Sequence, residues 1–220
     1  MKMRLLVATA ASLATLALAS TANATSFTGW YGGIEAGANW VPDKTVPNDT
    51  IDPNWSGGFV DKAQFDTGWA VMGSAGYAFG AVRTELELGY RANDLNQFGA
   101  STDGGSVDQF TVMANALYDY NITPDYQLSV GGGLGWDLVN YDNSSGFHSV
   151  PIKDTDSAFA WQLMAGVSRF MPSINADVVL NYRYLQTDAL TFTESDGTFM
   201  HDDNYNHLDN HTVTLGLRWH

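Results

Sequence analysis

The chain has 220 residues, with 24 acidic and 10 basic side chains and a formal net charge of −14 at pH 7. This acidity argues against nucleic-acid binding, because proteins that bind nucleic acids present basic surfaces to the phosphate backbone. The absence of cysteine excludes disulfides and a thiol nucleophile. Abundant glycine and aromatic residues (22 Gly, 7 Trp, 10 Tyr and 11 Phe), together with few charges, favour β-structure over helices.

The first 24 residues have the plan of a cleaved secretory signal peptide of the bacterial type. Lys2 and Arg4 give a basic start, an apolar run follows, and small residues stand at positions 22 and 24. The apolar run is short for a helix that anchors a protein in a membrane. We therefore expect residues 1–24 to be removed and residues 25–220 to form a single domain.

Eight later segments alternate apolar residues with polar or small ones, which is the period of a β-strand with two unlike faces. Each segment has about the length of a tilted membrane strand, longer than a typical strand of a soluble protein. The segments are Thr28–Trp40, Gly68–Phe79, Val82–Asn93, Asp108–Tyr118, Tyr126–Leu138, Ala158–Phe170, Ala176–Thr187 and His211–His220.

The connections between these segments alternate in length, as they do in outer-membrane barrels, which have short periplasmic turns and longer extracellular loops. The short connections are residues 80–81, 119–125 and 171–175. The long, polar connections are residues 41–67, 94–107, 139–157 and 188–210. We therefore predict an all-β protein, an eight-stranded antiparallel transmembrane β-barrel, whose four long loops face outside the cell.

Aromatic residues on one face of the strands gather near the strand ends. Trp30 and Trp40 are separated by roughly 25 Å along the axis of a barrel with tilted strands, which is about the height of a lipid-facing band. A soluble barrel, with its apolar face inside, does not predict this placement at the rims. The expected members of the two aromatic girdles are Trp30, Trp40, Trp69, Trp136, Trp161, Tyr184 and Trp219.

The opposite face carries small residues and charges of both signs, which fits the interior of a narrow barrel. Three lysines, at positions 44, 62 and 153, fall in the long loops, whereas all five arginines after the signal peptide fall in strands and need buried carboxylates. The expected charge network in the lumen consists of Glu35, Arg83, Glu85, Glu87, Arg91, Asp137, Arg183 and Arg218.

The segments GWYGGIEAGANW, ELELGYR, FTVMANALYDY, VGGGLGW and HTVTLGLRW resemble strands of the eight-stranded outer-membrane β-barrel family. That family includes the transmembrane domain of outer-membrane protein A and the opacity-type surface antigens. Barrels of the protein A type carry an interior salt-bridge network, and Glu35 and Glu87 match positions in it. Glu35 stands where the first strand of that barrel has a lysine, so the resemblance implies a different pairing here.

The resemblance also implies that barrel-assembly machinery reads an aromatic residue at the end of the last strand. Chains of the family usually end in such a residue, most often Phe, in phase with the outward side chains. Here the outward phase includes Trp219, and the chain continues to His220. Either Trp219 serves as that aromatic residue, or the sequence lacks a terminal Phe.

Two polar clusters are weak candidates for chemistry. His148 and Ser149 are adjacent, but they lie in a loop without a supporting acid at a suitable spacing, so no catalysis is expected. The segment 201–211 contains possible metal ligands, but their spacing matches no zinc or EF-hand pattern, and a hydrated acidic surface loop explains them better. Those ligand candidates are His201, Asp203, His207 and His211. No cofactor is expected.

We expect a protein of the bacterial outer membrane with a structural or surface-interaction role, such as membrane integrity or display of its loops as a surface antigen or adhesin. The expected partners are outer-membrane lipid and lipopolysaccharide, the assembly machinery, and an extracellular ligand or host surface. A small porin is the alternative. Eight strands enclose a lumen that side chains just fill, whereas the many inward glycines leave room for water.

Overall fold

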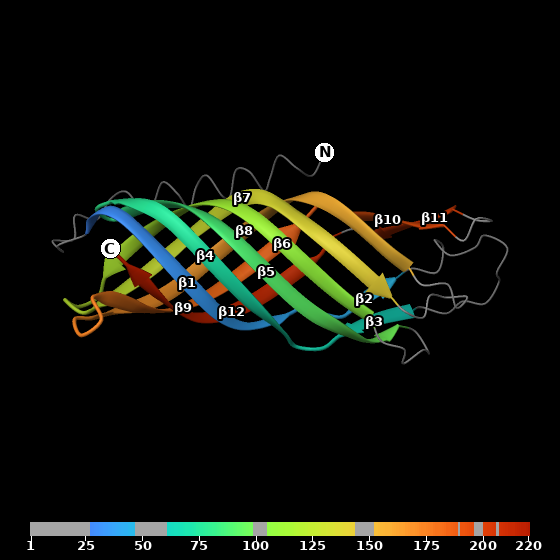
Figure 1. Cartoon of the computed structure of the whole chain (residues 1–220), viewed down its shortest axis with the longest axis horizontal. Coiled ribbons are helices and arrows are strands. Elements are labelled where there is room, and N and C mark those ends of the chain that lie inside the picture. The colour runs from blue at the N-terminus through green and yellow to red at the C-terminus, as the bar shows by residue number, and fades with distance from the viewer. Residues whose placement is uncertain are drawn as a thin grey trace.

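A computed structural model of the chain describes residues 27–46, 61–98, 105–143, 152–188, 190–195, 200–205 and 207–220. The expected signal peptide lies outside these residues. Within them, no helix has the length and apolar character needed to cross a membrane. Eight long strands form the wall of a barrel (Figure 1), and these are β1 (Thr28–Trp40), β4 (Gly68–Phe79), β5 (Val82–Phe98), β6 (Gly105–Asn121), β7 (Tyr126–Asn143), β8 (Ile152–Met171), β9 (Ala176–Thr187) and β12 (Asp209–Trp219).

The barrel is closed by antiparallel pairing of its first and last long strands. The eight strands are hydrogen-bonded in the cyclic order β1-β4-β5-β6-β7-β8-β9-β12, and β1 meets β12 with Ala38 opposite Val213. Closure gives hydrogen-bond partners to the backbone N–H and C=O groups of the edge strands, which lipid cannot provide. The predicted eight-stranded antiparallel barrel is therefore confirmed.

Four shorter strands lie at the end of the barrel that carries the long connections. Strands β2 (Lys44–Val46) and β3 (Asp61–Phe65) pair with each other, and β3 also extends the wall beside β5. Strands β10 (Leu190–Ser195) and β11 (Met200–Tyr205) form a separate hairpin. We call this the loop end of the barrel, and we call the opposite end, with the connections 80–81, 122–125 and 172–175, the turn end (Figure 1).

The predicted bounds of β1, β4 and β9 agree with the structure, those of β5 to β8 are too short, and β12 begins two residues and ends one residue earlier than predicted. Strands β5 to β8 continue into the segments 94–107 and 139–157, which were expected to be loops, and β6 also takes up residues 119–121 of an expected turn. On β7 the continuation carries the polar Asn140 and Asp142 on its outward face, in place of the outward apolar residues on which the prediction relied. At the turn end, Gly80 (φ 84°) and Asn175 (φ 48°) adopt the left-handed conformation of tight turns.

The inward and outward faces of the barrel wall exchange polarity near the loop end. On β7, Leu134, Trp136 and Leu138 are exposed and the inward Asp137 is buried, as expected for a wall in lipid. One residue further on the pattern reverses, because the inward Val139 is apolar and buried and the outward Asn140 is polar and exposed. The segments beyond this reversal (residues 94–98, 105–108, 139–143 and 152–157) and the two hairpins form what we call the loop-end extension.

The loop-end extension contains an apolar core of its own. This core closes over the polar lumen, and its residues are Val41, Val107, Val139, Tyr141, Ala158, Leu190 and Leu208, with Phe65 packed against them. Strand β8 has 20 residues and spans about 50 Å at a tilt of about 40°, roughly twice the height of an apolar membrane band. The barrel therefore consists of a membrane part and a part built like a soluble barrel.

We predict that the loop-end extension faces outside the cell, because long connections are extracellular in barrels of this architecture. Protease added to intact cells is expected to cut within the loop-end connections and to leave residues 122–125 and 172–175 intact. Opening the cells serves as the control, since both ends then become accessible. Cleavage at a turn in intact cells would contradict the orientation.

Candidate functional site: the lumen and its turn-end vestibule

The middle of the lumen is organised around Arg183, whose side chain is 1% exposed. Its guanidinium lies 2.8 Å from Glu35 Oε2 and 3.0 Å from Glu87 Oε2, so a single cation joins carboxylates from two other strands. Arg183 also donates to Thr214 Oγ1, and Thr214 in turn donates to Glu35 Oε2. Gln162 donates to Glu87 Oε1, which completes a buried set of satisfied charges across the barrel.

A second cluster lies nearer the turn end, around Arg83. The Nε of Arg83 is 2.7 Å from Asp119 Oδ2, and its Nη1 is 3.5 Å from Glu85 Oε2. Tyr31 donates its hydroxyl to Glu85 Oε2 at 2.7 Å, and its ring lies 5.3 Å from the Arg83 guanidinium carbon. Asn115 donates to Glu85 Oε1, linking this cluster towards Gln162 and the middle of the lumen.

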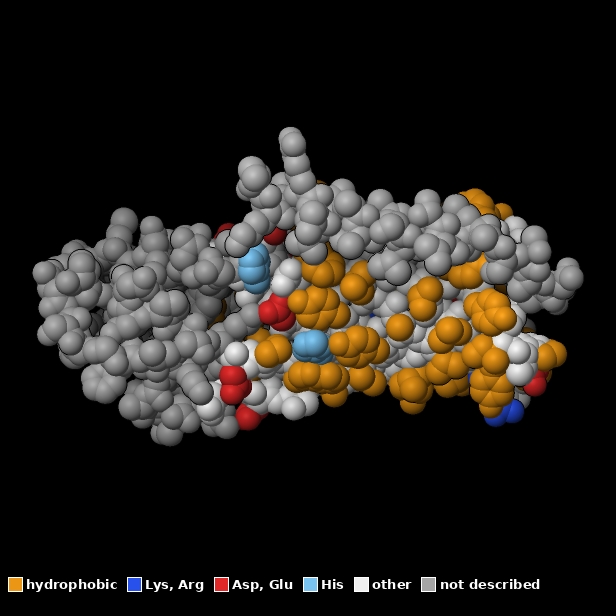
Figure 2. Space-filling view, turned by 180° about the vertical axis from the view of Figure 1, so that it is seen from behind, with side chains coloured by type: hydrophobic (Ala, Val, Ile, Leu, Met, Phe, Trp, Pro, Cys, Tyr) orange, Lys and Arg blue, Asp and Glu red, His pale blue; other side chains and the backbone are white. Residues whose placement is uncertain are grey.

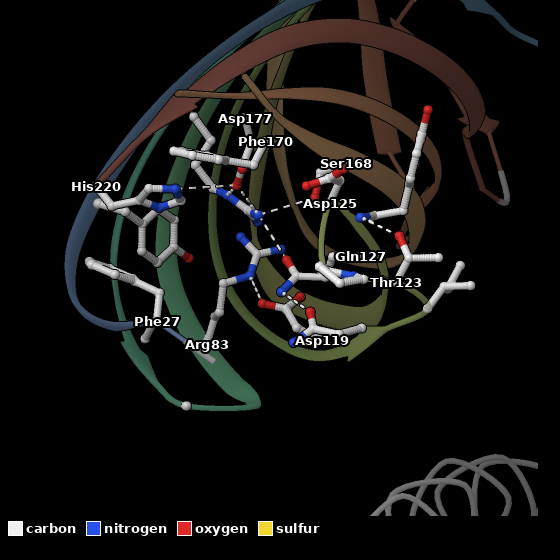
Figure 3. Close-up of a pocket in the computed structure, with 18 residues that line it drawn as sticks. Phe27, Arg83, Asp119, Thr123, Asp125, Gln127, Ser168, Phe170, Asp177 and His220 are labelled. Atoms are coloured by element: carbon white, nitrogen blue, oxygen red, sulfur yellow. Dashed lines mark hydrogen bonds and ion pairs between the residues drawn. The ribbon is translucent and has the colours of Figure 1, made fainter. Parts of the chain in front are cut away.

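A third cluster lies at the turn end, where β9 and β12 pair. Arg218 lies 2.6 Å from Asp177 Oδ2 and also donates to Gln127 Oε1 and Ser168 Oγ. The imidazole of His220 stands 3.5 Å from the same Asp177 oxygen. These groups line a vestibule of about 530 Å³ at the turn end, and Figure 3 shows Arg83 and Asp119 of the second cluster and Asp177 and His220 of the third around it.

Arg91 and Asp137 occupy the lumen on the loop-end side of Arg183, but in the part of the chain that the structure describes neither takes part in an ion pair of the expected charge network. Arg91 donates to Thr111 Oγ1 and Thr212 Oγ1, and within the described residues it has no ion pair. Asp137 accepts from Gln109 instead. One nitrogen of Arg91 and one oxygen of Asp137 lack a hydrogen-bond partner within the same residues. Strand register explains why Arg91 has no ion pair in the described lumen, because the residue opposite it on β6 is the uncharged Gln109.

Three asparagines form the last polar layer below the apolar core of the extension. Asn39 donates to the side-chain oxygens of Asn93 and Asn210 and accepts from Thr212, so β1, β5 and β12 are joined across the lumen. From the turn end to the loop end, the lumen thus passes from a vestibule through charged and amide layers to an apolar core.

The inward glycines do not leave the free space expected from the sequence. A Cβ atom on Gly133 would overlap the amide oxygen of Asn115, and one on Gly166 would overlap that of Asn181. In both cases the side chain that fills the space belongs to the residue directly opposite on the next strand. These glycines therefore accommodate cross-strand neighbours.

The predicted girdle residues all point outward. Trp30, Trp69, Trp136 and Trp219 are exposed, and Trp40 is 36% exposed. Trp161 and Tyr184 are half-buried because they pack edge-on against each other. Trp30 and Trp219 lie at the turn end of the apolar band, and the others lie at its loop end.

One arginine departs from the expectation that every strand arginine needs a buried carboxylate. Arg169 is exposed on the outer surface at the turn end, where its guanidinium carbon lies 5.4 Å from the centroid of the Tyr126 ring. A cation at that level reaches the lipid headgroups and requires no buried partner.

The two polar clusters singled out in the sequence fall largely outside the described residues. His148 and Ser149, and the side chains of His201 and Asp203, lie outside the described residues. His207 Nδ1 lies 3.3 Å from the carbonyl of Thr187. The described residues contain no group of three or more potential metal ligands.

Sequence reasoning missed two members of the lumen clusters, Asp119 and Asp177. The predicted strand ends at Tyr118, three residues before the end of β6, and so leaves Asp119 in a turn, although Asp119 continues the inward alternation of Thr111 and Asn115. Asp177 shares its inward phase with Arg183. Extending the alternation to the strand ends would have found both residues.

Comparisons with known proteins agree with this architecture. The sequence model of the family described as "Outer membrane protein beta-barrel domain" matches residues 6–220. The chain belongs to the outer-membrane β-barrel family. This membership places the protein in the bacterial outer membrane. No curated protein sequence is significantly similar to the chain.

Solved structures that resemble this barrel share its fold at low sequence identity. The outer-membrane protein AlkL is 17% identical, with a TM-score of 0.56 and coverage of 91% of this chain and 93% of that chain. OprG from Pseudomonas aeruginosa is 14% identical, with a TM-score of 0.55 and coverage of 90% and 100%. Neisserial surface protein A is 17% identical, with a TM-score of 0.53 and coverage of 87% and 96%. At these identities the likeness concerns the fold alone.

Proposed function

We propose that this outer-membrane barrel serves membrane integrity and surface interaction through its loop-end extension, and that it neither catalyses a reaction nor conducts solutes. The observation that carries this proposal is the exchange of faces at Val139 and Asn140. It gives the extension an apolar core and a polar exterior, which suit a folded platform in water above the membrane. Its expected partners are an extracellular ligand or host surface and the surrounding lipopolysaccharide.

The layered lumen supports the same proposal. Arg183, Glu35 and Glu87 fill the middle of the barrel with mutually satisfied charges, and the apolar core of the extension lies above them. An ion crossing this path would have to displace buried salt bridges and then traverse an apolar layer, and both steps oppose conduction.

A small porin is the second candidate function, and the turn-end vestibule of about 530 Å³ is the observation that favours it. Charged groups form part of the vestibule's lining, and the vestibule would admit hydrated ions to the level of Arg83 and Arg218. In this alternative, conduction would require an opening through the Arg183 cluster and the apolar core above it.

Solute uptake in cells that lack their major porins distinguishes the two functions. Cells that display the folded chain are expected to take up a small hydrophilic sugar at the rate of cells carrying an empty vector. Surface labelling of the extension verifies that equal amounts of folded protein are present. An uptake rate that rises with the amount of displayed protein would contradict the proposal and support the porin.

A further inference from the structure

A group of polar and aromatic side chains interrupts the lipid-facing surface of β1, β9 and β12 at the loop end of the apolar band. We call it the outer-rim patch, and it consists of Trp40, Tyr182, Tyr184, Gln186, Asp209 and His211. Strand register brings the six together, since His211 lies opposite both Trp40 and Tyr184, and Asp209 lies opposite Gln186. Figure 2 shows histidine and acidic side chains on this face where the hydrophobic band ends.

The patch is held together by hydrogen bonds on the outside of the barrel. Asp209 Oδ1 accepts from the Tyr184 hydroxyl at 3.0 Å and from Gln186 Nε2 at 2.7 Å. The Tyr182 hydroxyl lies 2.7 Å from His211 Nδ1. These interactions fix the direction of a carboxylate, an amide and two hydroxyls at a surface where the neighbouring outward residues, such as Leu180 and Leu215, are apolar and exposed.

An aromatic platform adjoins these polar groups. The rings of Trp40 and His211 are stacked, with centroids 5.8 Å apart and an interplanar angle of 8°, and the Tyr184 ring lies 5.3 Å from His211. Trp40 is 36% exposed and Tyr182 is 40% exposed, so both offer surface to a ligand. Flat rings beside a carboxylate and an amide suit a sugar ring, which has an apolar C–H face and hydroxyls at its edge.

We propose that the outer-rim patch binds the sugar headgroup of a glycolipid in the outer leaflet, namely the glucosamine and core sugars of lipopolysaccharide. The patch stands at the membrane boundary, where a headgroup meets the barrel wall. It includes a carboxylate and neither lysine nor arginine, which favours hydroxyls over phosphate as the contacted groups. The proposal requires outer-membrane location with the loop end outward and does not depend on whether the lumen conducts.

The test compares lipid binding by the refolded chain in nanodiscs, using native mass spectrometry with rough lipopolysaccharide and with phosphatidylglycerol as probes. The variant Tyr184→Phe/Asp209→Asn removes a hydroxyl and a charge while keeping side-chain shape. We expect its affinity for rough lipopolysaccharide to fall about tenfold, as loss of hydrogen bonds to a charged group implies. Phosphatidylglycerol binding is expected to stay unchanged.

A matched control is available on the opposite side of the barrel. Asp108 on β6 contacts Tyr90 on β5 at the same level of the wall, so Tyr90→Phe/Asp108→Asn removes the same groups elsewhere. We expect this control to bind lipopolysaccharide like the parent chain. The proposal is overturned if both double variants bind equally, if the parent chain shows no preference over phosphatidylglycerol, or if the patch variant instead abolishes a dimer seen in the mass spectrum.

Heat-modifiable electrophoretic mobility verifies that each variant is folded. A further variant, His211→Phe, keeps a ring against Trp40 but removes both nitrogens. We expect it to weaken lipopolysaccharide binding less than the Asp209 variant does, because the platform remains. If the Asp209 double variant does not fold, His211→Phe and Gln186→Ala still decide the question, since unchanged binding by both would overturn the proposal.

Discussion

Arg183→Ala is expected to lower the free energy of unfolding of the barrel by about 3–5 kcal/mol. The substitution removes the only partner of opposite charge shared by Glu35 and Glu87 in the described lumen, and Glu87 is fully buried. Two carboxylates would then face each other without a cation in a site closed to bulk water. Urea unfolding in lipid vesicles, followed by tryptophan fluorescence, measures the loss.

The exposed Arg169→Ala provides the control for this measurement, because it also removes a strand arginine but leaves no buried charge behind. It is expected to unfold at nearly the same urea concentration as the parent chain. Combining Arg183→Met with Glu35→Gln and Glu87→Gln is expected to recover much of the loss, since no buried charge then lacks a partner. A loss below about 1 kcal/mol for Arg183→Ala would indicate that water fills the lumen.

Val139→Asp is expected to destabilise the loop-end extension by about 3–5 kcal/mol while the membrane part of the barrel stays folded. Val139 is 1% exposed in the apolar core of the extension, and it lies opposite Asp156 on β8, so the new carboxylate would be buried and would face a like charge. Limited proteolysis of the protein in vesicles detects the loosened extension as faster cleavage at the loop end.

The adjacent residue supplies a closely matched control. Asn140→Asp introduces the same carboxylate one position further along β7, but on the exposed outer face. It is expected to leave the cleavage rate close to that of the parent chain. Equal effects of the two substitutions, or a large effect of Asn140→Asp alone, would contradict the exchange of faces in the extension.

The alternation of residue types was sufficient to predict the membrane part of the fold. Lipid and a narrow lumen impose opposite demands on neighbouring residues, so a strand such as β1 shows its two faces clearly, from Trp30 outward and Glu35 inward. The same alternation placed Arg183, Glu35 and Glu87 on one inward face. Their mutual distances could not be predicted, because these depend on the stagger of strands far apart in the sequence.

The loop-end extension was missed for a physical reason as well. Beyond Leu138 the wall leaves lipid, and the outward apolar residues that marked a strand are replaced by polar ones such as Asn140 and Asp142. The alternation continues with its faces exchanged, through Val139 and Tyr141. A pattern that reverses its polarity within one strand was interpreted as the start of a polar loop. The hydrogen-bond partners of Arg91 were not predicted, because strand register rather than charge determines which side chains lie beside it.

Planar-bilayer recording from the refolded chain tests most directly whether the lumen is closed. The Arg183 cluster and the apolar core above it predict that the inserted barrel gives no discrete current steps above the baseline of the bilayer. Insertion is verified in the same preparation by heat-modifiable mobility of protein recovered from the lipid. Regular, ohmic single-channel steps from the parent chain, scaling with the amount of inserted protein, would contradict a closed lumen.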